Sequence, residues 1–199
     1  MTIDRARFDR GMTYDAYKAQ MTRNLDRLEE NERRLQLRSD DLAAFRGLPQ
    51  PLNVVVLAED WCGDVIANLP VLGRLARESG KLDLRVFLRD QNDDIMQRYL
   101  NQEKFKSIPV FVFFDKDFRE LGHWIERPTS VTELRAKRRR EIFAAHPEFG
   151  SPDAPVDQLP EDVRARLAAE LQRMREETTP FANGEVVREL RDLVTRVAA

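Results

Sequence analysis

The apolar positions of the chain follow two spacings, one typical of strands and one typical of helices. The run from Leu52 to Ala58 is continuous and β-branched, which indicates a strand buried on both faces. Apolar and polar residues alternate from Leu82 to Asp90 and predict a second strand. The segments Ile108 to Asp115 and Arg119 to Ile125 predict two more strands, joined as a hairpin by the DKDF turn.

Spacings of three and four residues predict helices around these strands. Cys62 to Ser79 has this spacing, and Pro70 should kink the helix before Gly80 ends it. Nearer the N-terminus, Thr13 can cap another helix. The face of that helix is predicted to carry Tyr14, Tyr17, Met21, Leu25 and Leu28.

Three shorter or later helices complete the pattern. Two short ones are expected over Asp40 to Phe45 and Asp93 to Asn101, and a capping box of Ser130 and Glu133 should open a helix that ends near Ala145. The elements then alternate between helix and strand, with parallel crossovers first and an antiparallel hairpin last. This order predicts an α/β sandwich with a mixed sheet.

The remainder of the chain is predicted to be a helical extension. A proline-rich joint, His146 to Pro160, precedes two predicted helices that Thr178 to Gly184 separates. The two apolar stripes are Val163, Leu167, Leu171 and Met174, and Val187, Leu190, Val194 and Val197. Because the pair has few aromatic residues, we expect it to pack on the sandwich or on another subunit. We therefore predict a domain of residues 1–145 with an N-terminal helical segment, and an extension of residues 146–199 packed on it.

Four features of this pattern resemble the thioredoxin superfamily. Trp61, Cys62 and Gly63 follow a buried strand, and Cys62 then opens a helix. Pro70 stands eight residues after Cys62, where thioredoxins carry a helix-kinking proline. Ile108 and Pro109 precede the hairpin, where the family has its cis-proline. The resemblance implies a thioredoxin-like three-layer sandwich with a mixed four-stranded sheet. It also implies a site formed by Cys62 as the nucleophile and by Trp61, Gly63, Asp64, Ile108 and Pro109 as binding residues.

The chain departs from the family's dithiol pattern at three positions. Val65 replaces the second cysteine, and Asp64 replaces the proline that usually stands between the two cysteines. Dithiol thioredoxins hold a buried acid six residues before the nucleophile, and that position is Val56 here. The dithiol mechanism therefore does not transfer to this chain.

Composition narrows the classes of partner. The 199 residues include 42% hydrophobic and 34% charged residues, with a net charge of −2, so no overall basic field favours nucleic acid or anionic lipid. The longest apolar runs are too short to span a bilayer. One cysteine excludes an internal disulfide, and no metal site is predicted. A charged N-terminal stretch without an apolar core, together with the single thiol, predicts a cytoplasmic protein.

The chemistry that remains is that of one thiol. A helix start favours an anion, so Cys62 in that position should have a pKa below the free value of about 8.5. The Asp64 carboxylate would oppose this effect if it faced the sulfur, and the sequence leaves its orientation open. A mixed disulfide at Cys62 would need an external thiol, with glutathione as co-substrate, to release it. Lys104, Lys106 and Arg89 are candidates to hold its carboxylates.

Two other functions stay open at this point. A thioredoxin fold without its second cysteine can serve as a redox-inactive binding or chaperone-like module that uses the Trp61 and Pro109 surface. An iron–sulfur cluster shared by two subunits, each of which gives one thiolate, is a third alternative. The partners expected for the first function are protein or small-molecule thiols and disulfides, and a homodimer is compatible with all three.

Overall fold

Contacts within the chain divide it into two compact units. The computed structural model describes residues 3–198, with the side chains of residues 3–196. One unit contains the chain up to Arg127 together with the stretch from Val186 onward, and the other is Pro128–Glu185. The predicted boundary between residues 145 and 146 stays a prediction. No helix in the described part is long and apolar enough to cross a membrane.

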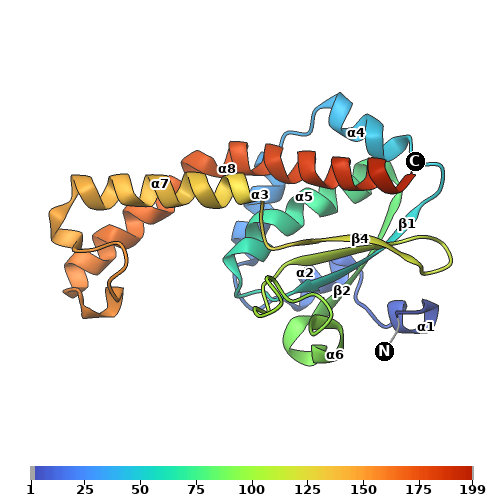
Figure 1. Cartoon of the computed structure of the whole chain (residues 1–199), viewed down its shortest axis with the longest axis horizontal. Helices are drawn as coiled ribbons and strands as arrows, with labels where there is room; N and C mark the ends of the chain where they lie inside the picture. Colours follow the sequence, from blue (N-terminus) through green and yellow to red (C-terminus); the bar gives the residue numbers. More distant parts are fainter. Residues whose placement is uncertain (1–2, 199) are drawn as a thin grey trace. The chain divides into compact units, whose positions relative to one another are not determined.

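The first unit is built on a mixed four-stranded sheet, as predicted (Figure 1). Its strands are β1 (Leu52–Ala58), β2 (Leu82–Leu88), β3 (Val110–Phe114) and β4 (Glu120–Ile125). They lie in the order β2-β1-β3-β4. β1 pairs in parallel with β2 and antiparallel with β3, and β3 pairs antiparallel with β4. The expectation of several parallel crossovers is therefore wrong, because β1 and β2 form the one parallel pair among the described strands.

The first unit also contains helices around its strands, and the second unit is helical. The helices are α1 (Arg5–Phe8), α2 (Tyr14–Gln20), α3 (Leu25–Arg34), α4 (Ser39–Arg46), α5 (Gly63–Ser79), α6 (Asp93–Met96), α7 (Thr129–Ala145) and α8 (Glu161–Ala198). Short 3-10 turns cover Arg89–Gln91, Pro147–Phe149 and Val156–Gln158. Within the first unit, α5 and the C-terminal part of α8 lie on one side of the sheet, and α1 and α6 lie on the other (Figure 1).

The core of the first unit lies between these layers and includes the C-terminal part of α8. Val186, Val187, Leu190, Leu193 and Val194 are buried in the same apolar cluster as β1 and β3. Three of the residues expected in the second stripe are among them, and the side chain of the fourth, Val197, lies outside those described. Burial of these side chains fixes the helix to the sheet.

The predicted break in the C-terminal helix is absent, since α8 runs without interruption from Glu161 to Ala198 through Pro180. The sequence interpretation missed a stripe with a constant spacing of four. Met174, Thr178, Ala182, Val186, Leu190 and Val194 are all buried along it. The Thr178 hydroxyl donates to the Met174 carbonyl at 2.8 Å, so its polar group is satisfied inside the helix. Side-chain packing thus outweighs the local preference of proline and glycine for a break.

The N-terminal helix is divided where one continuous face was predicted. α2 ends at Gln20 and α3 begins at Leu25, and Asn24 has a left-handed backbone with φ of 58°. The backbone N–H groups of Thr22 and Arg23 donate to Asp60 at 2.8 and 3.0 Å. These bonds take the donors that a continuous helix would use, and so they explain the break.

Two smaller differences concern helix ends. Ser130 does not cap α7, because the helix begins at Thr129 after Pro128 and Ser130 donates instead to Glu185 within the second unit. α6 is shorter than predicted and ends at Met96. Its four residues are a single turn, so the segment that follows forms a loop before β3.

Candidate thiol site

The candidate nucleophile stands at the start of the helix that follows the central strand. Cys62 is the N-cap of α5, and Gly63, which is exposed, is the first helical residue. The thiol is half-buried, so a reagent can reach it. β1 sets this position because it ends at Ala58 and leaves three residues for the turn before Cys62.

The sulfur lies against the residue that precedes the proline of β3. Cys62 Sγ donates a hydrogen bond to the Ile108 carbonyl oxygen at 3.4 Å. The Ile108–Pro109 peptide bond is cis, and both residues are buried. The structure thus brings together Cys62, Ile108 and Pro109 from segments that are 46 residues apart.

The pKa of the Cys62 thiol is raised above its ordinary value, mainly because burial disfavours the thiolate. The backbone N–H groups of Val65 and Asp64 lower it in part, as a helix start should. The carboxylates of Asp64 and Glu126 raise it further. The pKa decrease predicted from the helix start is therefore outweighed, and the thiol is protonated at neutral pH.

Trp61 forms an exposed rim beside the thiol. Its side chain is 44% exposed, and the Arg89 guanidinium lies over the ring, 4.8 Å from its centroid. Arg89 also donates to the Lys106 carbonyl at 3.1 Å, which joins the rim to the loop before Pro109. Of the other cations considered, Lys106 pairs with Asp93, and Lys104 lies over the Phe105 ring. Arg89 is thus the predicted cation whose contacts lie at the rim itself.

Asp64 takes part in a charge cluster that the sequence did not reveal. Arg127 Nη1 lies 3.0 Å from the Asp64 carboxylate, and the Nη2 of the same side chain pairs with Glu126. Glu126 also accepts from the Asn101 side chain at 2.8 Å. One guanidinium therefore bridges the two carboxylates that act on Cys62.

The backbone of Glu126 is held as firmly as its side chain. Its N–H donates to the Pro109 carbonyl at 2.8 Å, and its carbonyl accepts from the buried Asn68 side chain at 2.8 Å. Its φ of 63° lies in the left-handed region, which few non-glycine residues adopt. In the register of β3 and β4, Val110 pairs with Ile125, so the next residues along the two strands are Pro109 and Glu126. Knowledge of this register would have placed Glu126 beside Pro109.

Three further polar groups lie beneath the site. Asp60 accepts hydrogen bonds from the loop between α2 and α3, and its carbonyl accepts from Asn24 at 2.8 Å. Glu59 is buried, and burial raises the pKa of its carboxyl, which accepts from the Asp90 N–H at 2.9 Å. Tyr17 is fully buried on α2, and its hydroxyl has no hydrogen-bond partner. Burial and the charges of Asp60, Glu59 and Cys62 raise the pKa of Tyr17.

The unpaired hydroxyl of Tyr17 leads to a stability prediction. Tyr17→Phe removes a buried polar atom that makes no bond, so we expect it to leave the free energy of unfolding unchanged or raise it by about 1–2 kcal/mol. Urea unfolding at neutral pH measures this change. Tyr99→Phe is the matched control, because the Tyr99 hydroxyl donates to Glu120 at 2.8 Å. Loss of this hydrogen bond should lower the free energy of unfolding. A loss of more than about 1 kcal/mol in Tyr17→Phe would show that the hydroxyl is bonded.

Two of the three positions that distinguish this site from a dithiol, Val65 and Val56, are closed to solvent. Val65 is fully buried in the first turn of α5. Val56 is fully buried in β1, between Val86 and Phe111 of the neighbouring strands. Neither supplies a second thiol or an acid. Within the described residues, no group of three or more histidine, cysteine or acidic side chains could hold a metal ion.

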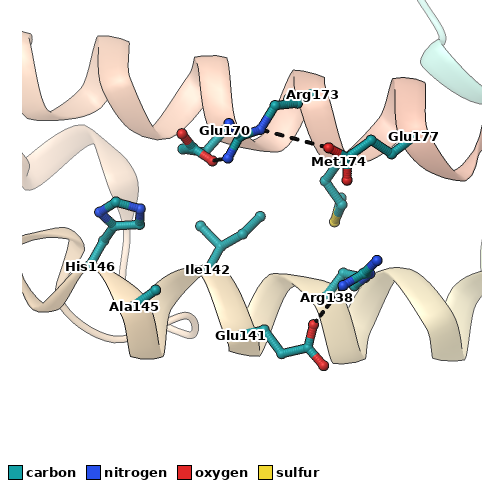
Figure 2. A pocket seen from close by; sticks show the side chains of 9 residues that line it. All are labelled: Arg138, Glu141, Ile142, Ala145, His146, Glu170, Arg173, Met174 and Glu177. Carbon is teal, nitrogen blue, oxygen red and sulfur yellow. Dashed lines mark hydrogen bonds and ion pairs between the residues drawn. The ribbon is translucent and has the colours of Figure 1, made fainter.

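The second unit has a hollow of its own. It has a volume of about 220 Å³, and Ile142 and Met174 point into it from α7 and α8 (Figure 2). Ion pairs flank it, with Arg138 on Glu141 and Arg173 on Glu170 (Figure 2). All of its lining residues belong to Pro128–Glu185, so it is separate from the thiol site.

Comparisons with known proteins support the fold. Two crystal structures match nearly the whole chain at 18% identity. One is an HIV epitope-scaffold protein, with a TM-score of 0.65 over 98% of this chain and 99% of the other. The second is a protein of unknown function from Pseudomonas aeruginosa, with a TM-score of 0.62 over 100% of both chains. At this identity the likeness concerns the fold alone, and no curated protein matches the chain.

A match at the level of sequence goes further. The family model described as Thioredoxin covers residues 11–139, which include the helix break, the sheet, Cys62 and Pro109. The resemblance inferred from Trp61, Cys62 and Ile108–Pro109 is confirmed. The chain belongs to the thioredoxin family.

Proposed function

We propose that the protein exchanges thiols with disulfides through Cys62 alone and that an external thiol completes the cycle. The observation that carries this proposal is the place of the sulfur. It is half-buried at the start of α5, where it accepts hydrogen bonds from the backbone N–H groups of Asp64 and Val65. As a thiol it donates to the carbonyl of Ile108. A disulfide that reaches the Trp61 rim would meet the sulfur next to the backbone of β3.

The exchange proceeds in two displacements. The Cys62 thiolate attacks one sulfur of a disulfide, the sulfur–sulfur bond breaks, and the departing thiolate takes up a proton. A second thiolate, from glutathione or a similar thiol, then attacks the mixed disulfide and releases the Cys62 thiolate. Val65 cannot perform this second step, so the external thiol is a co-substrate and no bound cofactor is required.

The pH dependence follows from the protonated state of the thiol. Because burial, Asp64 and Glu126 raise the pKa of Cys62, the thiolate fraction is small at neutral pH and grows as the pH approaches that pKa. Ionisation also removes the hydrogen that the thiol donates to Ile108. We therefore expect the rate of adduct formation with oxidised glutathione to rise from about pH 7 and to be still rising near about pH 9, above the ordinary thiol pKa of about 8.5.

Intact-mass measurement of the native protein over this pH range tests the proposal. The urea-denatured chain, in which the same cysteine has its ordinary pKa, gives the reference curve, and Cys62→Ser gives the blank. The proposal is supported if the native protein forms the adduct with a pH curve that lies above that of the denatured chain in pH, and if reduced glutathione removes the adduct. If the native protein forms no adduct at any pH at which the denatured chain does, exchange at Cys62 is excluded.

A second candidate is a redox-inactive binding module, and the raised pKa of Cys62 favours it specifically. The exposed face of Trp61 and the Ile108–Pro109 backbone would then contact a peptide without covalent chemistry. In that case Cys62→Ser would leave partner binding intact, whereas Trp61→Ala would weaken it. The shared iron–sulfur cluster, a cytoplasmic location and a homodimer also stay predictions. Absorbance of freshly purified protein in the visible range tests the cluster.

A further inference from the structure

Two negatively charged groups act on the sulfur from different segments of the chain. Asp64 comes from the first turn of α5, and Glu126 comes from the residue after β4. Each disfavours the Cys62 thiolate through its charge. A carboxylate opposes a neighbouring thiolate strongly in a half-buried setting, because water screens the repulsion only in part.

Arg127 contacts both groups and is placed to offset their charge. It contacts Asp64 at 3.0 Å and Glu126 through its other terminal nitrogen. Its side chain is 30% exposed, so it is partly shielded from solvent. A guanidinium presents a planar fork of donors and can hold two carboxylates at once, which a lysine ammonium does less well.

The cluster is fixed by the fold and does not depend on side-chain pairing alone. The Asn101 side chain donates to the Glu126 carboxylate oxygen that Arg127 does not contact, at 2.8 Å. The Asn68 side chain donates to the backbone carbonyl of Glu126, also at 2.8 Å. Pro109 accepts the Glu126 N–H, so the same residue that borders the thiol also anchors the acid. Arg127 therefore has a defined position relative to the reacting sulfur.

We propose that Arg127 is a positioning residue for Cys62, which keeps the thiol reactive by holding and neutralising the carboxylates of Asp64 and Glu126. This inference rests on the proposed exchange at Cys62 and adds the group that regulates it. Arg127 acts through the two acids, and no contact between Arg127 and the sulfur is required. The other groups that act on the thiol are the Ile108 carbonyl, the N–H groups of Asp64 and Val65 in α5 and, from α2, the buried Tyr17.

The expected effect of removing the cation has a definite sign. In Arg127→Gln the two carboxylates lose the guanidinium that bridges them, so the thiolate becomes harder to form. The Cys62 pKa should rise further, and we expect alkylation near pH 7.5 to slow by about threefold to tenfold. Asp64→Asn should act in the opposite direction, and the double variant should return to about the wild-type rate.

The experiment measures alkylation of the full-length native protein by iodoacetamide from about pH 7 to about pH 10, a range that brackets the free thiol pKa of about 8.5. This reagent is neutral, so the charge of Arg127 does not attract or repel it. Arg127→Lys should give an intermediate rate. Arg98→Gln is the matched control, because Arg98 pairs at 3.4 Å with Glu120, which begins β4, whereas Glu126 follows the other end of that strand.

The results separate a positioning role from a structural one. The inference holds if Arg127→Gln moves the midpoint of the pH profile upward, keeps the limiting rate at high pH, and is rescued by Asp64→Asn. It is wrong if the midpoint of Arg127→Gln matches wild type, or if the limiting rate changes without a shift in midpoint. Either result leaves the proposed exchange standing when wild-type protein still accepts glutathione. If wild type forms no glutathione adduct, the proposed function fails, whatever the alkylation profiles show.

Discussion

A chain that ends at Glu185 is expected to lose its stable fold, although it retains the sheet, Cys62 and Pro109. The deletion removes five side chains from the core of the first unit, Val186, Val187, Leu190, Leu193 and Val194. At about 1.5–3 kcal/mol for each, their burial is worth about 7–15 kcal/mol, which matches the whole stability of a typical domain at about 5–15 kcal/mol. The deletion also leaves the Trp124 indole N–H without Glu189, to which it donates at 2.7 Å.

Urea unfolding followed by circular dichroism measures this loss, and two point variants calibrate it. Leu190→Ala, at a fully buried position, should cost about 2–5 kcal/mol. Arg196→Ala, which is exposed on the same helix, should change stability by less than about 0.5 kcal/mol. If the truncated chain unfolds at the same urea concentration and with the same slope as the full chain, the C-terminal segment does not contribute to the core.

Val65→Cys is expected to turn the single thiol into a dithiol. The new cysteine would stand three residues after Cys62 in the first turn of α5, where two Cα atoms can lie within the roughly 4.4–6.8 Å that a disulfide requires. Cysteine is smaller than valine and tolerates an apolar site, so the fully buried position should accept it. We expect oxidation to join the two thiols and the reduced variant to reduce protein disulfides, which the wild-type chain cannot do in this way.

Intact mass after mild oxidation shows the new bond as a loss of two hydrogens, and insulin reduction measures the activity. Val65→Ala is the control, because it changes the packing and adds no thiol. The rate should stay modest, since Val56 offers no acid to move a proton beneath the pair. A variant that retains both free thiols after oxidation would show that the sulfur of Cys62 cannot turn away from Ile108.

The central elements of this fold could be predicted because their signals are local and mutually consistent. Leu52 to Ala58 is apolar at nearly every position and occupies the central strand β1, buried as expected. Trp61, Cys62 and Pro70 stand at fixed separations in one segment, so the start of α5 could be assigned without knowledge of the rest. The hairpin of β3 and β4 followed from two apolar runs and a short turn.

The remaining features depend on contacts between distant segments. The break before α3 follows from Asp60, which takes N–H groups from Thr22 and Arg23, and no local signal at those residues indicates it. The continuity of α8 follows from packing that outweighs Pro180. The sequence located Cys62 but not Arg127, because the ion pair with Asp64 joins residues that are 63 positions apart.

The division of the first unit along the sequence also affects how the protein folds during its synthesis. Because Val186 to Val194 belong to the core of a sheet that ends at Ile125, that core stays incomplete while residues 128–185 are being translated. At about 5–20 residues per second, this interval lasts about 3–12 s. During this time the sheet lacks the segment of α8 that packs in its core and whose Glu189 accepts from the Trp124 indole N–H. The nascent chain should therefore bind chaperones at this stage, and its folding should be completed only after translation has passed Val194.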